Sequence, residues 1–570
     1  MDSRLNWESR LEPLGKSTLT NSHKRWLYGL WLLLIVTFAL FHAVHLSADF
    51  PNHTPWYMDW AKYTDEGWYG NAAIRAHLFG NWYLPGDFNP APALPLWPFL
   101  EWVVFCFTGV SVEAARGFAV AFFFCNLLLS YLLLRTRAPR WVAMLAVTLI
   151  VTSPFVYCFS RLAILEPLLT TLTLAALNIA VRLGGLRRPV SASIVIGLLF
   201  SLMMLTKTTA VFLLPALGWA MLVPLWGQRR LAVRCALAAV ATLTVAYGFW
   251  MALVVHFGLI ADYKYLFFVN KYVRPKELTW PLVSLWWSFH GGLWVGRILV
   301  PLAGLVTLVA IVCAIGAFLR SDSGQVGRGA WARGLLLDPV FGASILSIAG
   351  YIFFMTYQNH PQPRYFAVVA IFSFLVVAQG AGTMLEQSIM AGVAKPHWSL
   401  KQAFGWAVIA LAVLTAAFNG LETLNYATHP EYTFVRAAQE LTQYIDTHPN
   451  GNRLLVSISG DQITLVSHVP TLCDDFGTPS PAYPDLVTKL ARYQPGWWAT
   501  WNDIDPGTLE DIHMHFSLEQ VASFRAFDDP ERNTLVLFKL HPLPMGQKRE
   551  YRPAELQVPL PGDKIDIGVQ

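Results

Sequence analysis

Two neighbouring carboxylates, Asp65 and Glu66, stand in a polar stretch of an otherwise apolar chain, within the run YTDEGWYG at positions 63–70. A carboxylate beside a reacting hydroxyl can take its proton, and a pair of carboxylates can also hold a divalent cation. Four more charged residues stand at the edges of apolar stretches: Arg161, Glu166, Lys207 and Arg364. This set suits a reaction in which a hydroxyl loses a proton and an anionic group leaves.

The composition of the 570-residue chain indicates an integral membrane protein. Hydrophobic residues make up 55% of it and charged residues only 14%, whereas charged residues make up about 25% of a soluble domain. The net charge of +5 comes mostly from short loops, which signals membrane topology rather than nucleic-acid binding. Apolar stretches of about 20 residues, long enough to cross a bilayer as a helix, recur along the chain. We predict about eleven spans, at residues 26–46, 114–135, 141–157, 162–182, 190–206, 208–227, 232–257, 297–319, 338–357, 365–385 and 403–425.

The apolar segment 94–110 decides the topology. Prolines crowd its start and Glu101 interrupts it, a pattern typical of a helix that lies in the membrane interface. If it does not cross, Arg135 and Arg140 fall on the same side as Lys24 near the N-terminus, as the positive-inside rule favours. The N-terminus is then cytoplasmic, and all six charged candidates lie at the outer boundary. A charge at the centre of a span costs about 2.5–3.5 kcal/mol, so we expect these residues to be paired, snorkelling or functional.

The chain becomes polar at about residue 427. Alternation typical of strands appears at 453–459 and 534–539, and helical patterns appear at 434–444 and 485–493. We therefore predict a mainly α protein, a polytopic helical body followed by a small C-terminal α/β domain. The predicted organisation is a cytoplasmic segment at 1–25, a transmembrane domain at 26–425 whose outer loop 47–113 carries the acidic pair, and an extracytoplasmic domain at 426–570.

Five motifs, in order along residues 26–425, resemble one family of membrane enzymes. They are DEGWYGNAAIR at 65–75, GVSVEAAR at 109–116, SRLAILEPLL at 160–169, TKTTAVFLLP at 206–215 and PRYF at 363–366. The ordered set resembles the C-type (GT-C) membrane glycosyltransferases, in the branch of the protein O-mannosyltransferases and the aminoarabinose transferase that acts on lipid A. The sequence departs from that pattern at Glu166, where the family usually has Asp, and at 90–95, where PAPALP replaces His-Pro-Pro.

The resemblance implies an inverting enzyme that moves a hexose or pentose from a polyprenyl phosphate to an acceptor hydroxyl at the outer face of a bacterial inner membrane. It implies that Asp65 is the base, and that Glu66 and Glu166 orient the acceptor or Asp65. Residues expected to bind the donor phosphate are Arg161, Lys207 and Arg364, and weaker candidates for acceptor or sugar contacts are Tyr69, His360 and Tyr365. A divalent cation at Asp65 and Glu66 stays open, as does the acceptor, which is a protein, a glycolipid or a polysaccharide.

Other interpretations compete with this one. A transporter or flippase for lipid-linked saccharides would place charges near the middle of the bilayer and would show two related halves. At the level of single residues, Asp65 and Glu66 would serve only to stabilise a helix N-terminus, Arg161 and Glu166 would form a structural ion pair, and Lys207 would snorkel from a helix end. The tryptophan pair at 497–498 would stack on sugars or fill a core.

Overall fold

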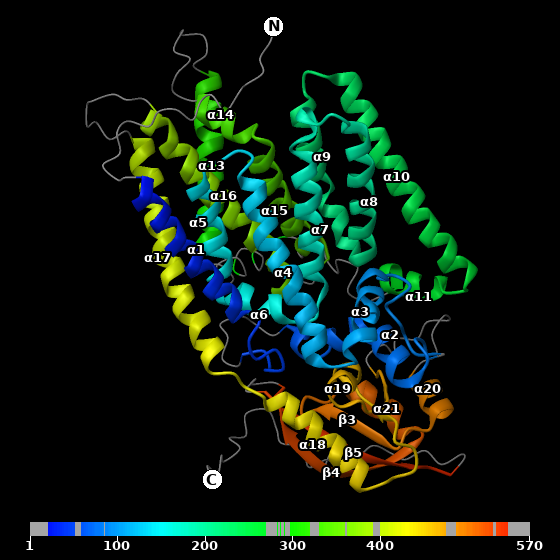
Figure 1. Ribbon diagram of the computed structural model, residues 1–570. Coiled ribbons are helices and arrows are strands. Elements are labelled where there is room, and N and C mark those ends of the chain that lie inside the picture. Colours follow the sequence, from blue (N-terminus) through cyan, green and yellow to red (C-terminus); the bar gives the residue numbers. More distant parts are fainter. Residues whose placement is uncertain are drawn as a thin grey trace.

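The computed structural model describes residues 21–51, 59–84, 86–269, 297–319, 330–358, 362–390, 400–474, 486–527 and 532–544, and the single positions 282, 286 and 290. Figure 1 shows a tall bundle of helices with a small sheet domain attached to one end. Helix α17 (Leu400–Thr428) descends directly into the sheet domain. This arrangement confirms the predicted mainly α body with a small C-terminal α/β domain.

Long apolar helices form the body of the bundle. Among the described residues, nine helical stretches are long and apolar enough to cross a membrane, and a bent pair makes a tenth. A shorter apolar helix at Arg25–Phe41 coincides with the first predicted span. The elements that match the predicted spans are α1 (Asn21–Phe41), α4 (Val112–Leu134), α5 (Arg140–Val151) with α6 (Pro154–Arg161), α7 (Leu165–Ala180), α8 (Pro189–Thr206), α9 (Leu214–Leu222) with its flanking 3₁₀ turns η4 (Thr208–Leu213) and η5 (Val223–Leu225), α10 (Arg229–His256), α13 (Leu299–Leu319), α15 (Pro339–Gln358), α16 (Phe366–Met390) and α17 (Leu400–Thr428).

Exposure separates a central helix from peripheral ones. Helix α16 is buried along nearly its whole apolar window, whereas only Cys235 and Val254 of α10 are buried. The exposed side chains of α10 are large and apolar, for example Leu237, Val245 and Phe249, with relative exposures of 64%, 72% and 67%. A surface so apolar is stable against lipid and not against water. The protein is therefore an integral membrane protein.

The predicted span at 141–157 is broken. Helices α5 and α6 meet at an angle of 68°. Ser153 accepts a hydrogen bond from the Val156 amide at 3.3 Å, and Pro154 occupies the first turn of α6, where its missing N–H is tolerated. The bend turns the chain sideways, so that α6 and the start of α7 lie at the end of the bundle that carries the sheet domain (Figure 1).

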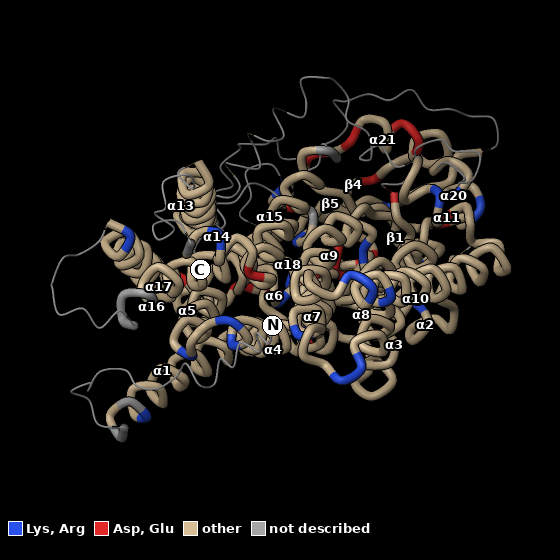
Figure 2. Tube along the Cα trace, turned by 90° about the horizontal axis from the view of Figure 1, so that it is seen from above, with Lys and Arg blue, Asp and Glu red and all other residues tan. Residues whose placement is uncertain are grey.

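Helices α2 (Asp65–Phe79) and α3 (Leu96–Thr108) lie at that same end. They pack against each other and do not pass through the bundle, as expected for the segment 94–110. Figure 2 views the molecule from the opposite end, where Lys and Arg residues mark many of the helix ends and loops. The acidic pair and the loop-borne basic residues therefore occupy opposite ends of the bundle.

Over its described residues, the C-terminal domain has a five-stranded mixed sheet and four helices. The strand order is β2-β1-β3-β5-β4, with β2-β1-β3 parallel and β3-β5-β4 antiparallel. Its elements are α18 (Thr433–Thr447), β1 (Leu455–Val456), α19 (Gly460–Ser467), β2 (Thr471–Leu472), α20 (Leu486–Tyr493), β3 (Trp497–Trp501), α21 (Pro506–His513), β4 (Phe516–Arg525) and β5 (Thr534–Pro542). Trp497 and Trp498 lie on β3 with exposures of 1% and 0%, so they fill the two faces of the core and do not stack on a sugar.

Candidate active site

Arg364 stands at the centre of a buried group of charged side chains. We call it the Asp65 group, and its members are Asp59, Asp65, Glu166, Lys207 and Arg364. Arg364 lies in a 3₁₀ turn, η9 (Pro363–Tyr365), just before α16. Its guanidinium donates to Asp59 Oδ1 at 2.5 Å, and its backbone N–H donates to Asp59 Oδ2 at 2.7 Å. A second carboxylate oxygen, Asp65 Oδ2, lies 3.1 Å from another guanidinium nitrogen. All three side chains are buried, so their attraction is weakly screened.

Asp65 is the first residue of α2, where the helix dipole favours a negative charge. The Thr64 hydroxyl donates to Asp65 Oδ1 at 3.0 Å. The other oxygen, Oδ2, is near Arg364 but lacks the alignment of a hydrogen bond. Burial raises the pKa of Asp65; Arg364 opposes this rise, whereas the Asp59 and Glu166 carboxylates add to it. Asp65 is thus a buried carboxylate with spare bonding capacity and an increased affinity for a proton.

A second ion pair, between Lys207 and Glu166, completes the Asp65 group. Glu166 lies in the first turn of α7 and Lys207 directly after α8, in extended backbone. Lys207 Nζ donates to Glu166 Oε1, while Oε2 of the same carboxylate has no hydrogen-bond partner. The Tyr365 ring links the two pairs, because Lys207 Nζ lies 4.3 Å and the Arg364 guanidinium carbon 5.0 Å from its centroid. Such cation–π contacts hold both cations on one aromatic surface.

The remaining weaker candidates have mixed outcomes. Tyr69, one turn after Asp65 on α2, is buried. Burial raises the pKa of its hydroxyl; the nearby Asp65 and Glu166 carboxylates add to the rise, and Arg364 opposes it. The structure therefore places Tyr69 and Tyr365 beside the Asp65 group. His360 lies outside the described residues, and its role remains a prediction.

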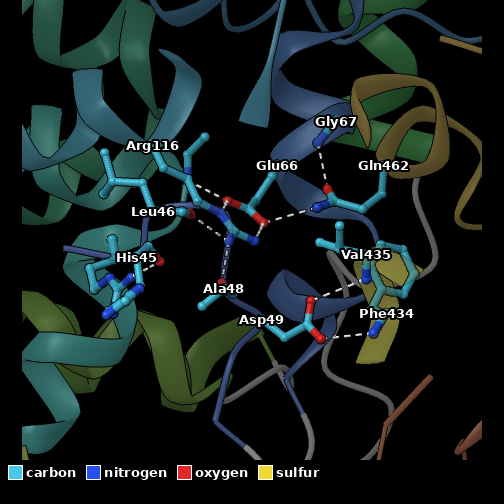
Figure 3. Close-up of polar contacts among 12 residues, drawn as sticks. His45, Leu46, Ala48, Asp49, Glu66, Gly67, Arg116, Phe434, Val435 and Gln462 are labelled. Atoms are coloured by element: carbon cyan, nitrogen blue, oxygen red, sulfur yellow. Dashed lines mark hydrogen bonds and ion pairs between the residues drawn. The ribbon is translucent and has the colours of Figure 1, made fainter. Parts of the chain in front are cut away.

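Glu66 forms a third buried ion pair, with Arg116 (Figure 3). Arg116 donates to Glu66 Oε1 at 2.7 Å and to Oε2 at 2.6 Å. The Ala163 amide donates to Oε1 at 2.9 Å, and Gln462 Nε2 donates to Oε2 at 2.9 Å. Four donors thus satisfy a carboxylate whose side chain is fully buried. A cation shared by Asp65 and Glu66 would require one of these ion pairs to open.

Arg161, predicted to bind phosphate, makes its contacts elsewhere. Its guanidinium donates to the backbone oxygens of Val44, at 2.7 Å, and His45, and to the Tyr157 hydroxyl. The predicted alternative of an ion pair with Glu166 is not what the structure shows, because Glu166 pairs with Lys207. Arg161 therefore ties α6 to the segment that follows α1. Among the described residues, no cluster of three or more His, Cys, Asp or Glu side chains has the arrangement of a metal site.

An apolar cavity of about 500 Å³ is lined in part by residues that lie close to members of the Asp65 group along the chain. Ala72 and Ala73, one turn beyond Tyr69 on α2, form one wall, and Leu205, two residues before Lys207, forms another. Trp250 of α10 contributes a third wall and donates its indole N–H to the Pro92 carbonyl at 3.0 Å. The lining is almost wholly apolar, so the cavity suits a hydrocarbon chain.

Three residues in these networks were not predicted from the sequence: Asp59, Arg116 and Gln462. Arg116 is the last residue of the motif at 109–116, but the motif alone indicates no role for it. Asp59 carries no local signal, because its partner Arg364 is 305 residues away. Gln462 lies in the C-terminal domain, outside the region that the motifs cover.

Comparison with known proteins gives one family match and several similar structures. Residues 90–258 match the family described as dolichyl-phosphate-mannose-protein mannosyltransferase. No curated protein gives a significant match. ArnT from Cupriavidus metallidurans in the apo state is similar in structure, with a TM-score of 0.53 and 14% identity over 90% of this chain and 98% of that one. The undecaprenyl phosphate complex of the same protein gives a TM-score of 0.52, 14% identity and coverage of 89% and 98%.

The archaeal oligosaccharyltransferase AglB from Archaeoglobus fulgidus aligns with a TM-score of 0.49 and 13% identity, over 92% of this chain and 76% of its own. Because the identities are low, the similarity to ArnT establishes the fold alone. The family match spans the segment from the loop before α3 to the end of α10. Together, the family match and the shared fold confirm the predicted resemblance to the C-type membrane glycosyltransferases.

Proposed function

We propose that this protein is an inverting glycosyltransferase that moves a hexose or pentose from a polyprenyl phosphate to an acceptor hydroxyl at the outer face of a bacterial inner membrane. The observation that carries the proposal is the Asp65 group. Its charged side chains come from four separate segments of the chain, and residues close to them along the chain line an apolar cavity of about 500 Å³. A lipid-linked sugar phosphate needs both features, an apolar channel for its tail and cations for its phosphate.

Supporting observations come from proteins of the same fold. The ArnT structure that this chain resembles was solved with undecaprenyl phosphate bound, and the matched family is described by its use of dolichyl-phosphate mannose. The basic loops at the end opposite the Asp65 group support a cytoplasmic N-terminus and an outer C-terminal domain. The acceptor is an unidentified protein, glycolipid or polysaccharide.

The chemistry assigned to each residue follows from its position. Asp65 takes the proton of the acceptor hydroxyl, whose oxygen then attacks the anomeric carbon as the bond from that carbon to the phosphate oxygen breaks. Inversion results because attack and departure occur on opposite faces of the sugar. The departing lipid phosphate takes up negative charge, which Lys207 and Arg364 stabilise in a setting of low dielectric constant. Arginine contacts a phosphate through two nitrogens, whereas lysine supplies a point charge.

Glu166 has a distinct place in this scheme. Lys207 donates to Glu166, so an arriving phosphate would compete with that carboxylate for the ammonium group. Once displaced, Glu166 can accept a hydrogen bond from the acceptor or the sugar through Oε2, which has no partner now. Glu66 and Arg161 hold the surrounding segments in place and do not contact the reacting atoms in this scheme.

The test is release of polyprenyl phosphate by the purified protein in detergent. The assay supplies undecaprenyl phosphates carrying mannose, glucose, arabinose or aminoarabinose, each labelled in the sugar, together with a membrane extract as the source of acceptor. The proposal predicts that one donor yields free undecaprenyl phosphate and labelled acceptor, and that Asp65→Asn abolishes both. A transporter or flippase would move the intact donor across proteoliposomes without cleaving it, and that result would overturn the proposal.

A further inference from the structure

The seam between α2 and the C-terminal domain places Gln462 against the residues that directly follow Asp65. Gln462 lies on α19 and is 1% exposed. Its Oε1 accepts a hydrogen bond from the Gly67 amide at 2.9 Å, and its Nε2 donates to Glu66 Oε2 at 2.9 Å (Figure 3). Both ends of one amide therefore bond to the first turn of α2, which fixes the orientation of the side chain as well as that of the turn.

The close approach of the two helices is an independent sign of a fixed seam. A Cβ atom added at Gly67 would lie 2.1 Å from the carbonyl carbon of Asp461 and 2.3 Å from the amide nitrogen of Gln462. Both are backbone atoms and cannot rotate away. Only glycine therefore allows α2 and α19 to meet at this distance.

Further contacts extend the seam along α2 and the loop beyond it. Asn71 donates to Asp461 Oδ1 at 2.5 Å, and Arg75 donates to the Thr471 carbonyl at 3.2 Å. Beyond α2, the Asp87 carboxylate pairs with the buried ammonium of Lys489 at 3.1 Å. The C-terminal domain thus forms hydrogen bonds with α2 at successive turns, and the first of them lie within two residues of Asp65.

We infer that Gln462 is a positioning residue for Asp65, so that the C-terminal domain is part of the machinery that holds the base in place. The inference rests on the proposed function of Asp65. The physical reason is geometric: the first turn of α2 carries Asp65 on one face and Glu66 on another, and Gln462 fixes this turn through both Gly67 and Glu66. A displacement of about 1 Å in a reacting group can lower a rate about 100-fold.

The primary variant is Gln462→Met, which keeps the length of the side chain and removes both hydrogen bonds. We expect kcat to fall about 10- to 100-fold, with the donor KM and the binding of undecaprenyl phosphate changed less than about twofold. Amide exchange in the peptide that contains Gly67 should become faster. The matched control is Thr442→Val, which removes the hydrogen bond from α18 to Ser467 at the other end of α19 and leaves both bonds from Gln462 to α2 in place. It should keep the parental kcat.

A second variant, Gln462→Glu, gives a readout that general destabilisation would not reproduce. Its carboxylate faces Glu66, with Arg116, Glu101 and Asp461 nearby, and like charges at this distance repel. When protonated, the new carboxyl can donate to Glu66 and still accept from Gly67. Its activity relative to the parent at the same pH should therefore recover as the pH falls, whereas that of Gln462→Met should not.

Asp65→Asn, assayed in parallel, separates the possible failures. If Asp65→Asn is inactive while Gln462→Met keeps the parental kcat, the positioning role is overturned and the proposed function stands. The positioning role is also overturned if Gln462→Met and Thr442→Val lose the same activity. If Asp65→Asn transfers sugar at the parental rate, the assignment of Asp65 as the base falls and the positioning role falls with it, whereas the proposed function falls only if the parental protein cleaves no donor.

Discussion

Asp65 and Glu66 are neighbours on one helix, and their surroundings differ in a way that separates chemistry from architecture. Glu66 accepts four hydrogen bonds, two of them from Arg116, and none of its bonding capacity faces open space. Asp65 has one hydrogen bond, from Thr64, and an imperfectly aligned guanidinium beside Oδ2. A buried polar atom without a partner is costly.

The same contrast extends to the ion pairs around each carboxylate. In the Asp65 group, Glu166 Oε2 and Arg364 Nε also lack hydrogen-bond partners, although both residues are buried. Around Glu66 the carboxylate and guanidinium saturate each other. We infer that incomplete bonding, rather than charge or burial, separates the proposed reacting group from the structural ion pair.

The largest effect on activity is expected from Asp65→Asn. The change keeps the shape of the side chain and removes the base, so we expect transfer to fall about 100- to 10,000-fold. The assay is turnover of labelled donor, with melting temperature as the test of folding. Asp446→Asn, which alters an exposed carboxylate paired with Arg453, is the matched control and should retain full turnover. Parental turnover by Asp65→Asn would remove the base assignment.

The next largest effect is expected on stability, from Arg116→Met. It leaves the buried Glu66 carboxylate without its main partner, and breaking a buried ion pair typically costs about 3–5 kcal/mol. Urea or thermal unfolding in detergent measures the loss. The same substitution at Arg453, whose side chain and that of its partner Asp446 are each 47% exposed, should cost less than about 1 kcal/mol. Equal losses at the two sites would contradict a structural role for the Glu66 pair.

A smaller effect should follow from Lys207→Met. The variant removes a point charge from the proposed phosphate site, so we expect the dissociation constant of undecaprenyl phosphate to rise about tenfold, which corresponds to about 1.4 kcal/mol. Titration calorimetry or a spin-labelled lipid would measure it. Lys264→Met, on the short helix α11 (Ile260–Lys264), is the control. Unchanged affinity in Lys207→Met would place the phosphate elsewhere.

The smallest effect concerns pH. Burial raises the pKa of Asp65, and the Asp59 carboxylate adds to this rise. A base acts only when deprotonated, so activity should decline on the acid side at a pH above the ordinary aspartate pKa of about 3.9. Asp59→Asn removes a negative charge near Asp65, and Asp65 is then the remaining carboxylate that pairs with Arg364. Both changes lower the pKa of Asp65. The acid limb of the kcat/KM profile should therefore move to lower pH in this variant; movement to higher pH would contradict the account.

The bundle could be predicted from the sequence because hydropathy and loop charge depend on local composition. Each predicted span coincides with a helix, and the segment 94–110 forms a short helix, α3, beside α2. The break between α5 and α6 at Pro154 is also a local effect, yet the span at 141–157 was predicted as one piece. In the C-terminal domain, β3 was missed because its run of tryptophans resembles an interfacial or sugar-binding segment as much as a core strand.

The partners within the site could be predicted only in part. Motif order indicated that Asp65, Glu166, Lys207 and Arg364 gather at one end, and the structure brings them together. Which charge pairs with which depends on tertiary contacts over long separations, so the pairing of Arg364 with Asp59 and of Glu66 with Arg116 had no sequence signal. Arg161 was expected at the same boundary as these residues, but its guanidinium donates to backbone oxygens and does not join the Asp65 group.

The most direct measurement is an experimental structure of the protein in lipid nanodiscs with undecaprenyl phosphate bound. The account predicts a phosphate within hydrogen-bonding distance, about 3 Å, of Lys207 Nζ and the Arg364 guanidinium. It also predicts the isoprenoid chain in the cavity between α2, α3 and α10, and Asp65 facing the space that the sugar would fill. A phosphate bound at the opposite end of the bundle, or beside Arg116 and Glu66, would contradict it.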